Sequence, residues 1–162
     1  MRDPADTQAL IVNLTSLCEQ LGELYKLLQL EETALAENSY QDIEQLAAKK
    51  TALTQQVEAS ECIRQTICDR LNIRANIDGI QAYIKDIDAT AKIKIIKLWQ
   101  RITILGQHCS SQNQLNGILV AHQQRRAREA LNILRGHFEI GNRYSKKGAQ
   151  ESEQPRHTLG KV

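Results

Sequence analysis

Leucines recur near the N-terminus at the spacing of a helix that packs against another helix. From Leu10 to Leu28 they step by 4, 3, 4, 3 and 4 residues, which places them along one narrow stripe of an α-helix. The next two steps along the stripe land on Glu31 and Leu35. A stripe this regular needs a partner helix to cover it. The pattern therefore predicts a long helix over residues 7–36 in an all-α, coiled-coil-like fold.

A second long helix is expected to follow directly. Asn38-Ser39 ends the first pattern, and Ser39 is the expected N-cap, with Asp42 three residues on. The helix is predicted to run to about Asn72, and three polar positions in its seam predict a thinner, wetter contact than the first helix makes. The seam consists of Ile43, Leu46, Lys50, Leu53, Val57, Ser60, Arg64, Ile67 and Leu71. A short break between two long helices predicts an antiparallel hairpin.

Residues 73–88 are irregular, with a possible short helix at 80–84, and a third long helix is predicted after them. Asp86 or Asp88 is the expected cap at its start, and Gly136 is the expected C-cap. Its seam is predicted at Ile95, Ile96, Trp99, Ile102, Leu105, Gly106, Cys109, Asn113, Gly117, Val120, Ala127, Leu131 and Leu134. Large apolar groups are scarce between Gly106 and Gly117. We expect this stretch to bend, to fray or to be completed by a partner.

These elements predict a three-helix bundle domain over residues 1–136. The 150 residues between Pro4 and Pro155 contain no proline, so nothing there interrupts long helices. Residues 137–162 have scattered charges, several glycines and little apolar periodicity. They are predicted to form a flexible, basic C-terminal tail.

The charge is divided unevenly along the chain. Residues 1–61 carry 4 basic and 11 acidic side chains, whereas residues 62–162 carry 17 and 8. An acidic helix pair packed beside a basic helix would account for this division, and so would a nucleic-acid surface on the second half. Packing is the simpler interpretation, because almost no aromatic residues stand among the basic ones to stack on bases. Arg125, Arg126 and Arg128 could contact phosphate or an acidic partner, or serve solubility alone.

No pattern of a catalytic, metal or cofactor site is present. The four cysteines lack zinc or redox spacing, so we expect reduced thiols in a cytoplasmic protein. His108 and Cys109 are neighbours on a helix and should not face each other. We expect no enzyme activity, no metal and no cofactor. We also expect no signal peptide and no membrane-spanning segment.

Two polar features have open interpretations. Glu31 and Glu32 could pair with Lys49 and Lys50 across the hairpin, although a solvated helix surface is the simpler explanation. Tyr144 is an aromatic residue in a polar segment. It stands there by chance or belongs to a short docking motif that becomes ordered on binding.

Four short motifs in the last third of the chain resemble one protein family. Asn113-Gln-Leu-Asn116-Gly117-Ile-Leu is similar to the N-x-x-N-G-x-L signature of the FlgN family of flagellar export chaperones. The segment Ala130-Leu-Asn-Ile-Leu134 resembles the family's last helical turns, and Tyr144-Ser-Lys-Lys-Gly148 resembles its Y-x-x-x-G tail motif. His157-Thr-Leu-Gly-Lys161 is similar to its closing residues. Ser145 departs from the pattern, since family members often carry glycine there.

The resemblance implies a function and two sets of site residues. FlgN-like proteins bind hook-associated (hook–filament junction) proteins, hold their terminal helices soluble and deliver them to the flagellar type III export gate. The client-binding residues that it implies are Asn116, Gly117, Val120, Ala127, Leu131 and Leu134. Tyr144 and Gly148 would dock to the cytoplasmic domain of the export-gate membrane protein. If the hairpin covers the client stripe in the free protein, client binding must rearrange it.

Two other functions remain open on the sequence. A coiled-coil structural or adaptor protein would self-assemble through the leucine seam. A basic helical nucleic-acid binder would bind with an affinity that falls steeply with salt. The export chaperone is preferred, and it predicts no nucleic-acid partner.

Overall fold

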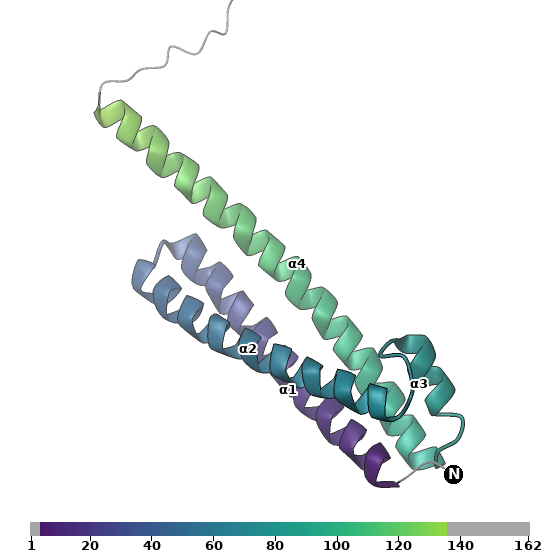
Figure 1. Ribbon diagram of the computed structural model, residues 1–162. Helices are drawn as coiled ribbons and strands as arrows, with labels where there is room; N and C mark the ends of the chain where they lie inside the picture. The colour runs from purple at the N-terminus through teal and green to yellow at the C-terminus, as the bar shows by residue number, and fades with distance from the viewer. Residues whose placement is uncertain (1–3, 136–162) are drawn as a thin grey trace, which may run out of the picture. The chain divides into compact units, whose positions relative to one another are not determined.

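The computed structural model describes residues 4–135, and within that range it consists of helices and connecting turns without a strand (Figure 1). The helices are α1 (Pro4–Glu37), α2 (Tyr40–Arg70), α3 (Ile77–Tyr83) and α4 (Ala89–Leu134). The predicted all-α fold, a long helical hairpin followed by a third long helix, is confirmed. The short helix expected at residues 80–84 begins earlier, at Ile77. Gly136 and the predicted tail at 137–162 lie outside the described residues.

Asparagines in the left-handed conformation end both helices of the hairpin. Asn38 has φ 57° and Asn72 has φ 54°. Beyond Asn38, the Ser39 amide donates to the Ala34 carbonyl at 3.0 Å, and beyond Asn72 the Ile73 amide donates to the Cys68 carbonyl at 3.0 Å. This six-to-one bond defines the Schellman motif, in which a left-handed residue stops the helix. Asparagine tolerates this conformation better than other residues with a side chain, which explains why both helices stop there.

The expected N-cap at Ser39 is correct in position and wrong in mechanism. Ser39 directly precedes α2, but its side chain makes no capping bond to the backbone. Its hydroxyl donates to the Asp42 carboxylate instead. The third long helix is capped as expected, because the Asp88 carboxylate accepts from the amides of Thr90 at 2.8 Å and Ala91 at 3.1 Å. These bonds lower the pKa of Asp88, and the Thr90 amide contributes most.

The main hydrophobic core lies at the end of the bundle where α1 begins and α2 ends. The short helix α3 and the start of α4 complete it, and Tyr83 on α3 is fully buried, with its hydroxyl 2.8 Å from the Thr7 hydroxyl. The buried members are Leu10, Ile11, Leu14, Ile67, Leu71, Ile80, Tyr83, Ile84 and Ile95. Every helix contributes to this cluster, so it holds all four helices together at this end of the bundle.

Arg64 of α2 ties the same end of the bundle together by polar contacts. Its guanidinium donates to the Ala75 carbonyl at 3.0 Å and to the Glu61 carboxylate. It also lies 5.2 Å from the centre of the Trp99 ring on α4, within the range of a cation–π contact. The predicted wet seam of α2 is thus present, with Arg64 and Ser60 buried in it.

A smaller core continues along α1, and it is thinner. It comprises Leu17, Leu21 and Leu28 of α1 with Cys109 of α4, and Val57 of α2 packs against it. The leucine stripe of α1 is buried as predicted, from Leu10 to Leu35, with Leu24 only partly covered. Polar contacts, described below, take over where this second cluster ends.

The chain divides into two units, residues 1–126 and residues 127–162. The first contains α1, α2, α3 and α4 as far as Arg126. The described part of the second is residues 127–135, the last turns of α4, where Leu131, Ile133 and Leu134 are exposed. The division predicted from the sequence, at residue 136, stays a prediction.

Candidate functional site

Side chains of α4 donate hydrogen bonds to backbone carbonyls of α1 at every seventh residue. Cys109 donates to the Leu21 carbonyl with Sγ and O 3.4 Å apart, and Asn116 donates to the Leu28 carbonyl at 2.8 Å. Gln123 donates to the Leu35 carbonyl. A helical carbonyl can accept these bonds besides its own intrahelical one, since it has two lone pairs. We call these three contacts the α1–α4 ladder.

The ladder fixes how α1 and α4 are aligned. Each donor lies 88 residues after its acceptor in the sequence, so the two helices run in the same direction with a constant heptad register. The same offset places Glu37, the last residue of α1, level with Arg125. The part of α4 that runs beside α1 therefore ends one residue before the first unit of the chain does.

The seam predicted for α4 is wrong beyond Cys109. The pattern placed Asn113, Gly117 and Val120 against the hairpin, but these three are exposed, and Asn116 is buried. The observed seam continues the heptad of Ile95 through Cys109 to Asn116. The sequence pattern predicted small and apolar residues on the face of α4 that contacts α1. The side-chain amides of Asn116 and Gln123 occupy this face instead and donate to carbonyls of α1.

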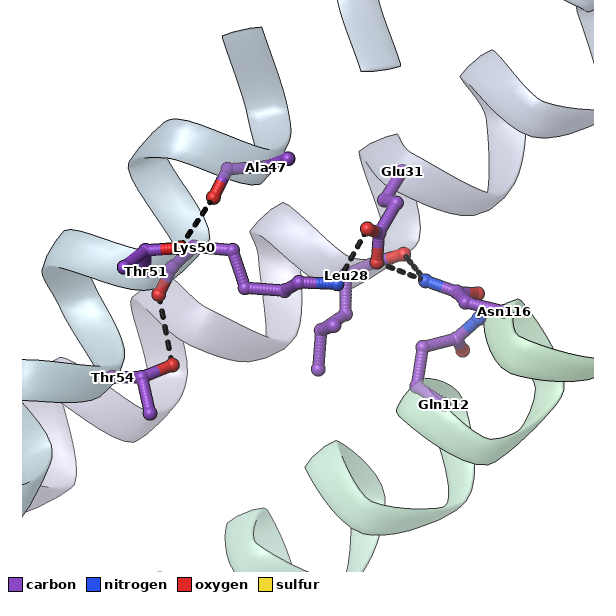
Figure 2. Close-up of polar contacts among 8 residues, drawn as sticks. All are labelled: Leu28, Glu31, Ala47, Lys50, Thr51, Thr54, Gln112 and Asn116. Atoms are coloured by element: carbon purple, nitrogen blue, oxygen red, sulfur yellow. Dashed lines mark hydrogen bonds and ion pairs between the residues drawn. The ribbon is translucent and has the colours of Figure 1, made fainter. Parts of the chain in front are cut away.

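Glu31, near the C-terminal end of α1, connects the three long helices (Figure 2). Its carboxylate accepts from Lys50 of α2 at 2.5 Å and from Asn116 of α4 at 2.8 Å. Glu31 is buried, and Lys50 is partly covered. One helical turn before Asn116, Gln112 donates to the Asn116 amide oxygen at 3.1 Å and to the Glu32 carboxylate at 2.8 Å. This network holds α4 through hydrogen bonds at a level where the apolar core is thin.

The network also corrects the simpler explanation of these charges. A solvated surface was favoured for Glu31 and Lys50, but the pair is formed across the hairpin and its carboxylate is buried. Both residues occupy seam positions of their helices, and a charged group in a seam can be accommodated only with a partner. That signal was present in the sequence and could have identified the pair.

An open cleft of about 570 Å³ lies beside the network, between α2 and α4. Leu24 and Leu28 of α1 and Cys109 of α4 supply its apolar lining. The complete lining is Leu24, Leu28, Lys50, Thr51, Thr54, Gln55, Glu58, Cys109, Ser110 and Asn113. The part of α4 that was expected to be completed by a partner thus borders this opening, which we call the α2–α4 cleft.

The client-binding residues expected from the sequence divide into two groups. Asn116 is 2% exposed and its side-chain nitrogen is bonded to α1, so it holds the bundle together. The others are exposed, and they include Val120 at 37%, Leu131 at 48% and Leu134 at 82%. Gly117 and Ala127 are exposed as well. The expected docking residues Tyr144 and Gly148 lie outside the described part of the chain.

Cys109 and His108, which are adjacent on α4, have different surroundings. Cys109 is buried in the ladder, and burial raises the pKa of its thiol. Its neighbour His108 is exposed, and its ring lies 5.2 Å from that of Tyr25. Among residues 4–135 no group of His, Cys, Asp and Glu side chains could hold a metal ion.

No helix among residues 4–135 is both long enough and apolar enough to cross a bilayer. The exposed apolar residues of these helices are distributed singly or in short rows along helix surfaces, of which the end of α4 is one.

Comparison with known proteins identifies one family. The model of the FlgN family, described as FlgN protein, matches residues 1–152. Neither a search of curated proteins nor a search of solved structures finds a match to the chain. The family match spans all four helices.

Proposed function

The chain belongs to the FlgN family of flagellar export chaperones, and on this premise we propose that it binds the terminal helices of hook-associated flagellar proteins and delivers them to the type III export gate. It acts in the cytoplasm, before the client is secreted. The family is one of chaperones rather than enzymes, so the protein works by binding and release.

The observation that carries the proposal is the row of exposed aliphatic residues near the end of α4. Leu131 and Leu134 are three residues apart, so they lie near one side of the helix, and both are exposed. Val120, in the first unit of the chain, is exposed as well. An amphipathic helix can bind such a row with anchors three and four residues apart. Nearby Arg125, Arg126 and Arg128 are exposed as well and would bring an acidic client segment to the helix.

Substituting one anchor tests this surface. Leu131→Asp should weaken binding of a hook-associated protein's terminal segment by at least about tenfold, because a carboxylate would have to be desolvated in the contact. Isothermal titration calorimetry measures the affinity, and circular dichroism checks that helicity is unchanged.

Ile133→Asp is the matched control for this substitution. Ile133 is an exposed aliphatic residue two positions away, about 200° around the same helix. Equal losses from both substitutions would reject the proposed row, whereas equal retention would place the client elsewhere on the chain.

The second half of the proposal concerns delivery. Tyr144 is proposed to dock on the cytoplasmic domain of the export-gate membrane protein, with Gly148 in the same motif. Tyr144→Ala should spare the client complex and weaken binding to that domain. If both affinities fell together, the division of roles between α4 and the tail would be refuted.

A further inference from the structure

The α2–α4 cleft is a place where the bundle is not closed. In a complete three-helix bundle the faces of α2 and α4 would meet there, but this part of α4 presents small or polar residues. A Cβ added at Gly106 or Gly117 would meet nothing within 4 Å. The apolar side chains of Leu24, Leu28 and Cys109 therefore border an opening rather than a packed helix.

Most polar groups of the α2 wall are bonded within the bundle, and Gln55, which is exposed, adds an uncharged amide. Thr51 donates its hydroxyl to the Ala47 carbonyl at 3.0 Å, and Thr54 donates to the Lys50 carbonyl at 2.8 Å (Figure 2). Both hydroxyl protons are thus used within α2. The Lys50 ammonium is paired with Glu31. Only Glu58, which is exposed, adds a carboxylate to the lining.

The α4 wall carries no formal charge at all. Between Arg101 and Arg125, α4 contains no Asp, Glu, Lys or Arg, although a quarter of the whole chain is charged. Ser110 and Asn113 line the cleft from this stretch. A partner that buried a charge against this wall would find no opposite charge to pair with. Aliphatic and uncharged polar side chains could enter without that cost.

We propose that the α2–α4 cleft seats a helix of the client, and that the inserted face carries aliphatic residues flanked by Ser, Thr, Asn or Gln and no formal charge. The α2 wall from Lys50 to Glu58 spans about 12 Å, or a little over two helical turns. The inserted helix completes the bundle at the level where the apolar core is thin. It adds a second contact to the row near the end of α4.

This assignment rests on the proposed function, since it names a second surface for the same client. It also defines the client's chemistry. A helix with Asp, Glu, Lys or Arg on the inserted face would be rejected by the cleft, whereas a helix with a neutral inserted face would be accepted, whatever charges its other faces carry.

Two adjacent serines allow a matched test. Ser110 lines the cleft and Ser111 does not, and both are exposed on α4. Ser110→Lys places an ammonium on the neutral wall, whereas Ser111→Lys makes the same chemical change outside the cleft. The full chain with each substitution is titrated with a synthetic terminal segment of a hook-associated protein, and Ser110→Ala is included as an uncharged control.

The expected result is a tenfold or larger loss of affinity for Ser110→Lys and less than a twofold change for Ser111→Lys and Ser110→Ala. Equal affinities of the two lysine variants would overturn the cleft assignment while leaving the chaperone function intact. The same holds if Ser110→Lys changes only self-association, measured by light scattering, because the occupant would then be a second copy. Absence of binding by the unsubstituted chain would overturn the proposed function and the cleft assignment together.

Discussion

At the scale of single residues, Asn116 is the polar group on which the position of α4 depends most. It is almost fully buried, and its amide nitrogen donates both to the Leu28 carbonyl and to the Glu31 carboxylate. Polar residues in a coiled-coil seam fix register at some expense of stability. Asn116 is placed to do so, since a shift of α4 by one turn would leave both acceptors without it.

Replacing this amide should therefore be costly. Asn116→Asp removes the donor and puts a carboxylate beside Glu31, and we expect it to lower the free energy of unfolding by about 1–3 kcal/mol. Urea unfolding followed by circular dichroism measures the loss. Asn113→Asp is the control, because Asn113 is exposed, and its effect should stay within about 0.5 kcal/mol. Similar losses for both would show that the hydrogen bonds of Asn116 do not hold the helix.

At the scale of helices, the boundaries follow from local chemistry that the sequence displays. Asn38 and Asn72 end α1 and α2 in left-handed turns, and Asp88 caps α4. These residues were identifiable because caps act within a few positions of the chain.

The cap of α4 predicts a pH dependence. The pKa of Asp88 is lowered chiefly by the Thr90 amide. Its stabilising contribution is therefore present above the carboxyl's ordinary value of 3.8 and is lost as the pH falls through the lowered pKa. Asp88→Ala should lower the thermal midpoint at pH 7, and the difference from the unsubstituted chain should shrink below pH 3.8.

Asp88→Asn provides the control for this prediction. An amide can cap a helix about as well as a carboxylate, but it does not titrate. The Asn variant should therefore keep most of the stability at pH 7 and show a weaker loss in acid. A difference between Asp88→Ala and the unsubstituted chain that stays constant down to the most acidic pH would contradict the assignment.

The lateral packing of the helices was less predictable than their ends. The stripe of α1 was predicted because leucine repeats without interruption, and it is buried. On α4 the same method failed after Cys109, since Asn116 and Gln123 face α1 through hydrogen bonds to its backbone. Backbone carbonyls are present at every residue and leave no sequence signal. The α2–α4 cleft could likewise not be derived, because it depends on how two distant helices diverge.

At the scale of the whole molecule, an apolar core holds the helices together at one end of the bundle, and polar contacts hold α4 farther along. All four helices share the apolar core near Tyr83, whereas α4 is held farther along by the ladder and the Glu31 network. Regions with few buried apolar contacts open at lower free energy than the core. Separation of α4 from α1 should therefore start near the level of Gln123 and progress toward Trp99.

Thiol reactivity can follow this opening. Cys62 is exposed, whereas Cys109 is buried in the ladder and its thiol has a raised pKa. A thiol reagent should thus modify Cys62 quickly and Cys109 only as fast as α4 opens. Mass spectrometry of modified peptides distinguishes the two. Asn116→Ala should accelerate modification of Cys109 and leave that of Cys62 unchanged, and equal rates for both cysteines in the unsubstituted chain would refute a closed ladder.

Binding of a hook-associated protein is the central claim, and a titration of the 162-residue chain with that protein's terminal segment tests it most directly. The account predicts a saturable binding isotherm by calorimetry, with a negative heat-capacity change from burial of the apolar surfaces on α4 and in the cleft. Absence of binding to the terminal segment of every hook-associated protein tested would contradict it.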